Sequence, residues 1–566
     1  MMRIARTLAA VAVLAAAFAG AAGAQGAPAE WVFTGGTVWT ADSAHPRASA
    51  VAVRGGRIVW VGEAKDAAAW TGRATTVIDL RGRMLLPGLH DSHLHPAAGG
   101  VELGECLLDA DTTRAMLITH IAQCARSGTG WLRGRGWQLP IFPDANPSRT
   151  LLDSLAPGRP AYLRSADGHG AWVNSKALAL AGITAATPDP PRGRIERDAS
   201  GRPSGTLRES ATGLVARMMP ARTWQDYVHG LRRTMALANS LGITSLTDAD
   251  ADTLMLRAYV ALDSAHALTT RILATQHTDA AAGASQVPRL IAQRARFTVG
   301  HVRATAAKIY ADGVIEARTA ALLQPYAGTS DRGPTPIPPE RMDSLVVALD
   351  RAGFQVHVHA IGDRGVRMAL DAFAAARAAN GARDSRHQIA HLEMIDTLDV
   401  PRFAQLGVLA DFQPLWAYRD SYIRDLTEPV LGPERSSRLY PIGSVVRAGG
   451  TIVGGSDWIV SSMDPLAAIQ VAVTRRDPDA PAGPPWLPNE VVTLDRILAA
   501  YTIEGARADF QERETGSISV GKAADLLVLD RDLTAVPPAD IHRARAVLTM
   551  LEGKAVFGDA AKLRAP

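Results

Sequence analysis

Eight short apolar runs, most of them separated by helical patterns, constrain the fold of this chain more than any other feature. Alternating strands and helices favour a parallel sheet covered by helices, and eight such units fit a (β/α)8 barrel. One run is residues 84–89, and the other seven lie at residues 243–247, 271–275, 307–311, 355–360, 388–391, 408–412 and 451–454. The predicted fold class is therefore α/β, with one TIM-type barrel.

Three stretches lie outside this alternation. Residues 99–220 are far too long for one crossover, so we expect them to form an insertion with its own structure. Residues 31–80 contain short β-like runs separated by glycine-rich turns, and residues 526–557 repeat this texture. Neither end is large enough for a convincing separate domain, and the two could pair with each other.

Residues 1–24 have the three-part pattern of a secretory signal peptide. Two arginines precede an apolar stretch at residues 8–18, and Ala-Gly-Ala at residues 22–24 resembles a cleavage site before Gln25. The alternative, a transmembrane anchor, needs about 20 continuous apolar residues, and this run is shorter. No cysteine directly follows the cleavage site, and no later segment is long and apolar enough to span a bilayer. We therefore expect a periplasmic or secreted chain with no membrane anchor after cleavage.

Cysteine content and charge exclude several classes of protein. Two cysteines are too few for a disulfide scaffold, a cysteine-rich zinc module or an iron–sulfur protein. In an oxidising compartment Cys106 and Cys124 can pair, although two buried thiols are the alternative. The net charge of +4 is a small basic excess, and no basic run like those of nucleic-acid binders occurs. We expect a large enzyme with a small-molecule substrate and no nucleic-acid partner.

Metal-ligating side chains follow several of the predicted strands. His93 and His95 come after the first strand, and residues two apart on a strand point to the same side. Such a pair alone is weak evidence in a chain with 15 histidines. Other side chains that can bind a metal lie at or just after the ends of four more predicted strands, namely Lys308, His359, His391 and Asp457. Because the catalytic groups of a barrel lie at the carboxyl ends of its strands, these side chains are predicted to form one metal site.

This ordered set resembles that of the amidohydrolase superfamily of metal-dependent hydrolases. Within it, the chain is most similar to the amidohydrolase-3 group, which includes N-substituted formamide deformylase. The group's recurring phrases begin with Pro-Gly-Leu-His-Asp-Ser-His-Leu-His at residues 87–95 and continue at residues 134–137, 167–169, 172–178, 312–320, 359–364 and 516–525. Trp458 is a departure, since relatives more often carry a small residue there, and this difference concerns the shape of the pocket.

The resemblance implies a domain organisation. Residues 25–85 and 511–566 would form the two parts of a composite β-sandwich beside the barrel. Residues 86–98 would give the first barrel strand, residues 99–220 an insertion domain over the active site, and residues 221–510 the remainder of the barrel.

The resemblance also places three side chains at the substrate pocket. These are Trp137 and His169 in the insertion and Arg318 after the fourth strand. A structural role inside the insertion is the alternative for Trp137 and His169. His357 lies on the same strand face as His359 but one layer deeper, so we expect it to support the site rather than bind a metal.

The implied chemistry is metal-assisted hydrolysis of an amide, a formamide or a related C–N bond. Zn²⁺ is the default for imidazole and carboxylate ligands, and it lowers the pKa of bound water so that hydroxide attacks the carbonyl carbon. Asp457 would carry the proton of the water to the leaving amine.

The number of metal ions depends on Lys308. By the resemblance, His93, His95 and Asp457 would hold one ion and His359 and His391 a second, with a carbamate formed from Lys308 and CO₂ between the two ions. The alternative is a single ion beside an unmodified Lys308.

Two other functions stay open. A mononuclear deaminase of the same superfamily should show a glutamate soon after His359, where this chain has Asp363. A non-catalytic binding protein on the same fold should have lost a ligand, whereas the set here is intact. A homodimer is the commonest state of soluble oligomers and is the expectation for this chain.

Overall fold

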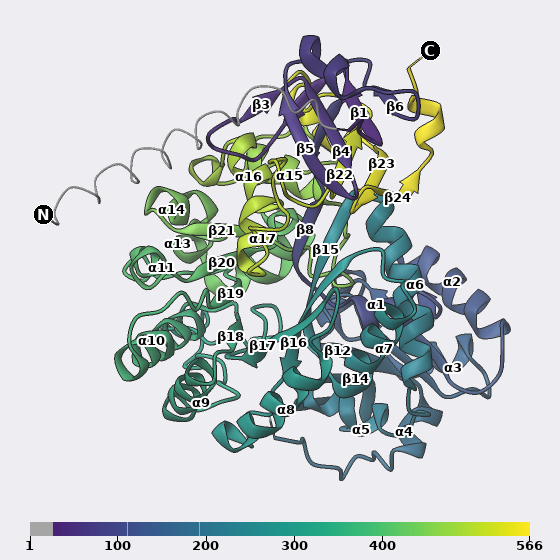
Figure 1. The fold of residues 1–566 in the computed structure, drawn as a ribbon. Coiled ribbons are helices and arrows are strands. Elements are labelled where there is room, and N and C mark those ends of the chain that lie inside the picture. The colour runs from purple at the N-terminus through teal and green to yellow at the C-terminus, as the bar shows by residue number, and fades with distance from the viewer. Residues whose placement is uncertain (1–26, 110, 192, 566) are drawn as a thin grey trace, which may run out of the picture.

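A barrel of eight parallel strands forms the centre of the molecule, as predicted (Figure 1). The computed structural model describes residues 27–109, 111–191 and 193–565, so the predicted signal peptide lies outside the described residues. Neighbouring strands follow chain order around the barrel: β8 (Leu89–Leu94), β15 (Ile243–Ala251), β16 (Arg271–His277), β17 (Val302–Tyr310), β18 (Gln355–Ala360), β19 (Gln388–His391), β20 (Leu409–Phe412) and β21 (Thr451–Gly454). At the junction of β21 and β8, the backbone N–H of Asp457 donates to the carbonyl oxygen of His93 at 2.7 Å.

The first barrel strand begins later than the sequence predicts. The prediction places it at residues 84–89, but Met84–Pro87 (β7) pairs with Leu526–Leu529 (β22) outside the barrel. The barrel strand pairs with β15 from Leu89 onward. Both runs are completely buried, so hydrophobicity does not separate them. Gly88 lies between the two runs, and a side chain there would collide with Thr244 of β15.

Two mixed sheets made by the two ends of the chain pack beside the barrel (Figure 1). One sheet has the order β5 (Arg57–Gly62), β4 (Ala50–Arg54), β1 (Trp31–Thr34) and β6 (Thr76–Asp79). The other has the order β24 (Lys554–Gly558), β23 (Ala546–Leu551), β22, β7, β2 (Thr37–Trp39) and β3 (Arg47–Ala48). Apolar side chains of both sheets share one core, which includes Phe33, Leu85 and Leu526. The expected association of the two ends in a β-sandwich is thereby confirmed.

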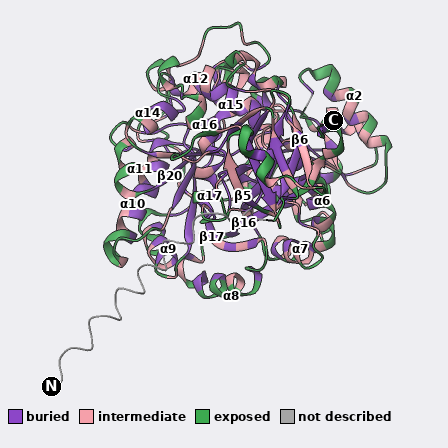
Figure 2. Ribbon diagram, turned by 45° about the horizontal axis from the view of Figure 1, so that its top comes forward, coloured by how far each residue is buried: buried purple, intermediate pink, exposed green. Residues whose placement is uncertain are grey.

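Amphipathic helices cover the outside of the barrel. The best-defined is α6 (Trp224–Ser240), which begins with a reciprocal capping box between Thr223 and Asp226 and buries Leu231 and Met235. Figure 2 shows these helices with exposed residues on the outside, around strands that are largely buried. The principal ones are α7 (Thr253–Ser264), α8 (Val287–Phe297), α9 (Pro339–Arg351), α10 (Asp363–Asn380), α11 (Val400–Leu406), α14 (Ile442–Arg447), α15 (Pro465–Thr474), α16 (Leu494–Ala500) and α17 (Ile503–Ala508). No helix in the described part of the chain is long and apolar enough to cross a membrane.

An insertion separates α1 (Pro96–Glu102) from α6 (Figure 1). Its six-stranded sheet has the order β13 (Gly193–Arg197), β14 (Pro203–Glu209), β12 (Gly170–Val173), β11 (Ala161–Ser165), β10 (Leu132–Trp137) and β9 (Cys106–Leu107). Short helices pack around this sheet, namely α2 (Arg114–Arg126), α3 (Arg149–Leu155), α4 (Ser175–Leu180) and α5 (Gly213–Ala216). Two apolar clusters give the insertion a core of its own, and one of them contains Trp137.

The predicted disulfide between Cys106 and Cys124 is confirmed. It joins β9 to α2, and the two Cα atoms lie 5.8 Å apart. The bond therefore closes a short loop at the edge of the insertion.

Removing this bond should destabilise the insertion. For a loop with a sequence separation of 18 residues, the chain-entropy relation gives a loss of about 3 kcal/mol in the free energy of unfolding. Urea unfolding of Cys106→Ala/Cys124→Ala, followed by circular dichroism, measures this loss. Thiol titration of the unfolded, unreduced wild type is the control, and two free thiols per chain would contradict the pairing.

Candidate metal centre

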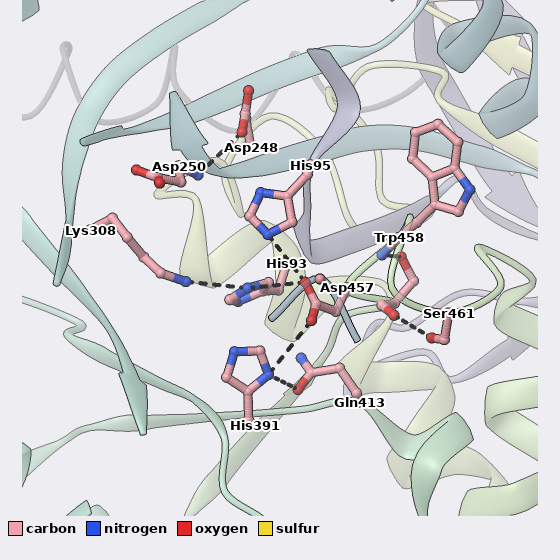
Figure 3. Close-up of polar contacts among 12 residues, drawn as sticks. His93, His95, Asp248, Asp250, Lys308, His391, Gln413, Asp457, Trp458 and Ser461 are labelled. Atoms are coloured by element: carbon pink, nitrogen blue, oxygen red, sulfur yellow. Dashed lines mark hydrogen bonds and ion pairs between the residues drawn. The ribbon is translucent and has the colours of Figure 1, made fainter. Parts of the chain in front are cut away.

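The carboxyl ends of β8 and β21 bring two imidazoles and a carboxylate together. Asp457 Oδ1 lies 3.6 Å from His93 Nε2 and 3.3 Å from His95 Nε2 (Figure 3). This oxygen is buried and has no hydrogen-bond partner. The backbone N–H of His95 donates to the carbonyl oxygen of Trp458 at 2.7 Å, which fixes the two chain segments side by side. An unpartnered carboxylate oxygen between two imidazole nitrogens is a suitable position for a cation.

Lys308 reaches the same point from β17. Its Nζ lies 3.3 Å from His93 Nε2, and its side chain is almost completely buried (Figure 3). Burial lowers the pKa of the Lys308 amine, although the carboxylates of Asp250 and Asp457 oppose this shift. Lys308 therefore loses its proton more easily here than a lysine in water does.

His359 and His391 form the other side of the centre, with ring centroids 4.4 Å apart. His391 Nδ1 donates to Gln413 Oε1 at 2.9 Å, which leaves its Nε2 free. His359 Nε2 lies 3.2 Å from the carbonyl oxygen of Gly313, which leaves its Nδ1 free. Burial, with neighbouring positive charge, holds the pKa of both imidazoles well below 6.5. Neutral imidazoles of this kind offer lone pairs to a metal.

Two buried side chains, His357 and Asp411, hold His93 in position. His93 Nδ1 lies 2.9 Å from His357 Nε2, and Asp411 Oδ2 lies 3.3 Å from the same His357 nitrogen. Because His93 Nδ1 is engaged by His357, Nε2 is the nitrogen that faces Asp457. This position of His357 fits the supporting role expected from the sequence.

The loop before Asp457 is held by a second buried carboxyl. Asp91 accepts hydrogen bonds from the backbone N–H and the hydroxyl of Ser456. Burial raises the pKa of Asp91 to about 7, and the bonds from Ser456 oppose this shift. Asp91 and Ser456 thus orient Asp457 without reaching the centre.

A cavity of about 570 Å³ opens onto the centre. His359, His391 and Asp457 form its floor, and His169 and Gln138 of the insertion form part of its wall. A volume of this size suits a small molecule.

His169 lies in the cavity wall, as expected from the sequence. Its Nδ1 is 3.1 Å from Glu209 Oε2. Burial opposes protonation of His169, but the charge and the hydrogen bond of Glu209 raise its pKa to about 9. A protonated imidazole, paired with the carboxylate of Glu209, therefore faces the cavity from the insertion.

The structure does not bring the other two expected pocket residues to the cavity. Trp137 is completely buried in the insertion core, where its Nε1 donates to the carbonyl oxygen of Leu163 at 3.0 Å. Its assignment to the pocket is corrected to the structural role that was the alternative. Arg318 is exposed on the loop after β17 and does not line the cavity, so its assignment is corrected as well.

Several cavity residues were missed by the sequence analysis. Glu393 has a sequence signal, because it follows His391 by two positions in the same strand-like pattern. The others come from loops or, for Trp416, from a single 3-10 turn, and these segments have no periodic pattern that would mark them in the sequence: Glu316, Trp416, Tyr418, Asp420, Tyr422 and Tyr440.

The donor set fits a divalent metal. His93, His95 and Asp457 place their donor atoms within 4.8 Å of one another. Neutral imidazole nitrogens with one carboxylate are typical ligands of Zn²⁺ and related ions. His93, His357 and Asp411 also place their donor atoms within 4.8 Å of one another. Because His357 contacts His93 directly, we interpret His357 and Asp411 as residues that hold His93 in position and not as metal ligands.

The chain is similar to known proteins in sequence and in fold. The sequence pattern of the amidohydrolase family matches residues 76–557. Protein LONG AFTER FAR-RED 3 of Arabidopsis thaliana is 30% identical over 94% of this chain and 92% of its own length. N-substituted formamide deformylase of Arthrobacter pascens is 29% identical over 91% of this chain and 96% of its own length. An uncharacterized metal-dependent hydrolase from Pyrococcus furiosus has a similar fold, with a TM-score of 0.68 and 24% identity over 89% of this chain and 99% of its own.

Proposed function

This chain belongs to the amidohydrolase family, and on that premise we propose that it hydrolyses a C–N bond of an amide, a formamide or a related small molecule. The observation that carries the proposal is the unpartnered oxygen of Asp457 between His93 and His95, on the floor of a cavity of about 570 Å³. The likeness over nearly the whole chain to a protein named N-substituted formamide deformylase supports the choice of bond.

Two sets of residues would hold metal, with Zn²⁺ as the preferred ion. His93, His95 and Asp457 would hold one ion, and His359 and His391 a second. When bound, such an ion supplies Lewis-acid activation of water.

Lys308 would join the two sets as a carbamate. The lone pair of its neutral Nζ attacks the carbon of CO₂, an N–C bond forms, and one N–H proton leaves to solvent. The product is an anion with two oxygen donors. Burial of the amine and its distance of 3.3 Å from His93 support this modification.

The remaining steps use groups of the chain itself. The Asp457 carboxylate lines the cavity, so it can accept the proton of the attacking water and return it to the leaving nitrogen. His169 holds a positive charge in the cavity wall through Glu209, where it can stabilise negative charge on the carbonyl oxygen.

Metal analysis combined with a substrate panel tests the function. The panel contains N-formyl, N-acyl and carbamoyl compounds, starting with formanilide, and amine release is measured. We expect turnover that is lost on chelation and restored by Zn²⁺. Full turnover in metal-free protein, or release of ammonia from aminopurines alone, would contradict the proposal, and the second result would establish a deaminase.

His357 provides a test of how His93 is held in position. We expect His357→Ala to weaken metal affinity about 10- to 100-fold, because a ligand that loses its orienting partner binds less well. Competition with a chromogenic chelator measures this affinity. His301→Ala is the matched control, since His301 contacts Glu552 instead of the metal centre. Loss of all metal at saturating concentration would show that His357 is itself a ligand.

We also propose that the mature protein is exported, without a membrane anchor, and acts as a homodimer. The signal-like pattern of residues 1–24 and the disulfide between Cys106 and Cys124 support export. Mass spectrometry of the protein from its native compartment should give a chain that begins near Gln25. A cytosolic chain that retains Met1 or Met2 would overturn this expectation.

A further inference from the structure

One part of the cavity wall is acidic and lacks basic partners. It consists of Glu316 on the loop after β17, Glu393 after β19 and Asp420 on the loop after β20, and we refer to these three as the acidic wall. None of the three forms an ion pair with any described residue. Arg135 is the only lysine or arginine among the described residues that line the cavity, and it is engaged by Asp109 at 2.7 Å.

Glu393 is the member of the acidic wall whose carboxyl is buried and incompletely hydrogen-bonded. Its side chain lines the cavity and is only 5% exposed, and its Oε2 is buried without a hydrogen-bond partner. The phenol of Tyr440 contacts the same carboxyl. A buried carboxyl without a basic partner is unfavourable in its charged form, so a carboxyl that lines a cavity points to a ligand that supplies a positive charge.

The other two carboxyls of the acidic wall are held in place by hydrogen bonds. Glu316 accepts a hydrogen bond from the hydroxyl of Thr427, which fixes it in the wall. Asp420 accepts from the backbone N–H of Ile423 at 2.9 Å. Burial and the neighbouring Glu316 and Asp420 raise the pKa of Glu393 well above its usual value, so a positively charged occupant would relieve the repulsion among the three carboxyls.

Aromatic rings line the cavity beside the acidic wall. They are those of Trp416, Tyr418, Tyr422, Tyr440 and Trp458. Trp416 is held in place, because its Nε1 donates to Ser461 Oγ at 2.9 Å and its ring stacks on His391 at 5.7 Å. Aromatic faces next to carboxylates are a characteristic surface for an organic cation.

We propose that the acidic wall binds a positively charged nitrogen group of the substrate. The compound hydrolysed would thus carry an ammonium or guanidinium group in addition to the C–N bond that is cleaved. This inference rests on the proposed function and names its substrate class. Neither Glu316 nor Glu393 contacts Lys308, His93 or Asp457 in the described residues, so this group would be bound separately from the reacting carbonyl.

Binding of two matched probes to the metal-loaded protein tests the inference. Benzylammonium and benzyl alcohol have nearly the same size and differ in charge. We expect benzylammonium to bind at least tenfold more tightly by calorimetry at neutral pH. The preference should fall to twofold or less in Glu316→Gln/Glu393→Gln, which keeps the shape of the wall and removes two acidic groups. Glu340→Gln, an exposed change in the first turn of α9, should keep the full preference.

Three outcomes separate this inference from the proposed function. Equal binding of both probes to the wild type would overturn the acidic wall as a cation site, and formanilide turnover would then still support the function. A preference that survives in the double variant would assign the cation to another site and would overturn the inference as well. A charge-dependent preference without turnover of any amide would keep the cation site and reject the hydrolase. Metal content of the double variant shows that the fold is intact.

Discussion

Replacing Asp457 by asparagine is expected to lower kcat by about 10²- to 10⁴-fold while most of the bound metal is retained. The range is that of a lost general acid–base group, because an amide oxygen can still face the metal but cannot accept a proton. Oδ1 of Asp457 is the carboxylate oxygen that lies near both His93 and His95 and has no hydrogen bond of its own. The measurement is steady-state release of amine, with metal content determined on the same sample.

The control for this variant is Asp530→Asn. Asp530 directly follows β22 in the sandwich and pairs with Arg531, so its charge is lost far from the cavity. It should keep wild-type turnover and metal content. Near-normal kcat in Asp457→Asn would contradict the role of Asp457 as the proton carrier. Loss of all metal would instead show that its charge is essential for binding, and turnover would then be restored only at high metal concentration.

The barrel and the side chains that meet at the candidate metal centre could be predicted from the sequence because their signals are local. Strand ends are marked by apolar runs, and His93, His95, Lys308, His391 and Asp457 all lie on such runs or directly after them. The one strand error, residues 84–89, arose where two consecutive buried strands are separated by Gly88 alone. Hydrophobicity identifies buried strands but not the sheet to which each strand belongs.

The pocket residues could not be predicted in the same way. Trp137 belongs to a motif, yet it serves the insertion core, since its indole packs against Trp172 and Phe142. Glu316 and Tyr440 reach the cavity from loops whose course depends on contacts distant in the sequence. Side chains of this kind have no periodic pattern, so only the folded chain shows that they share a wall.

Replacing Lys308 by arginine is expected to reduce the bound metal from two ions per chain to one or none. Turnover should fall at least ~100-fold, because losing a bridging ligand should cost at least as much as losing a residue that only orients a ligand. Arginine keeps a positive charge but cannot react with CO₂. Two unit charges 4 Å apart repel by about 4 kcal/mol at an effective dielectric constant of 20, so a cation beside His93 disfavours a metal. Elemental analysis per chain gives the metal content. Lys65→Arg, at an exposed position, is the control and should keep both ions.

Two further measurements distinguish the carbamate from a simple loss of charge balance. Lys308→Ala leaves space where a bridging anion belongs, so a short carboxylic acid should restore part of the turnover and of the second ion. In the wild type, carbon-13 bicarbonate should give a carbamate resonance that is absent from Lys308→Arg. The burial of Lys308 and the lowered pKa of its amine favour this reaction, because only the neutral amine attacks CO₂. Full metal content and near-normal turnover in Lys308→Arg would defeat the carbamate and leave one ion held by His93, His95 and Asp457.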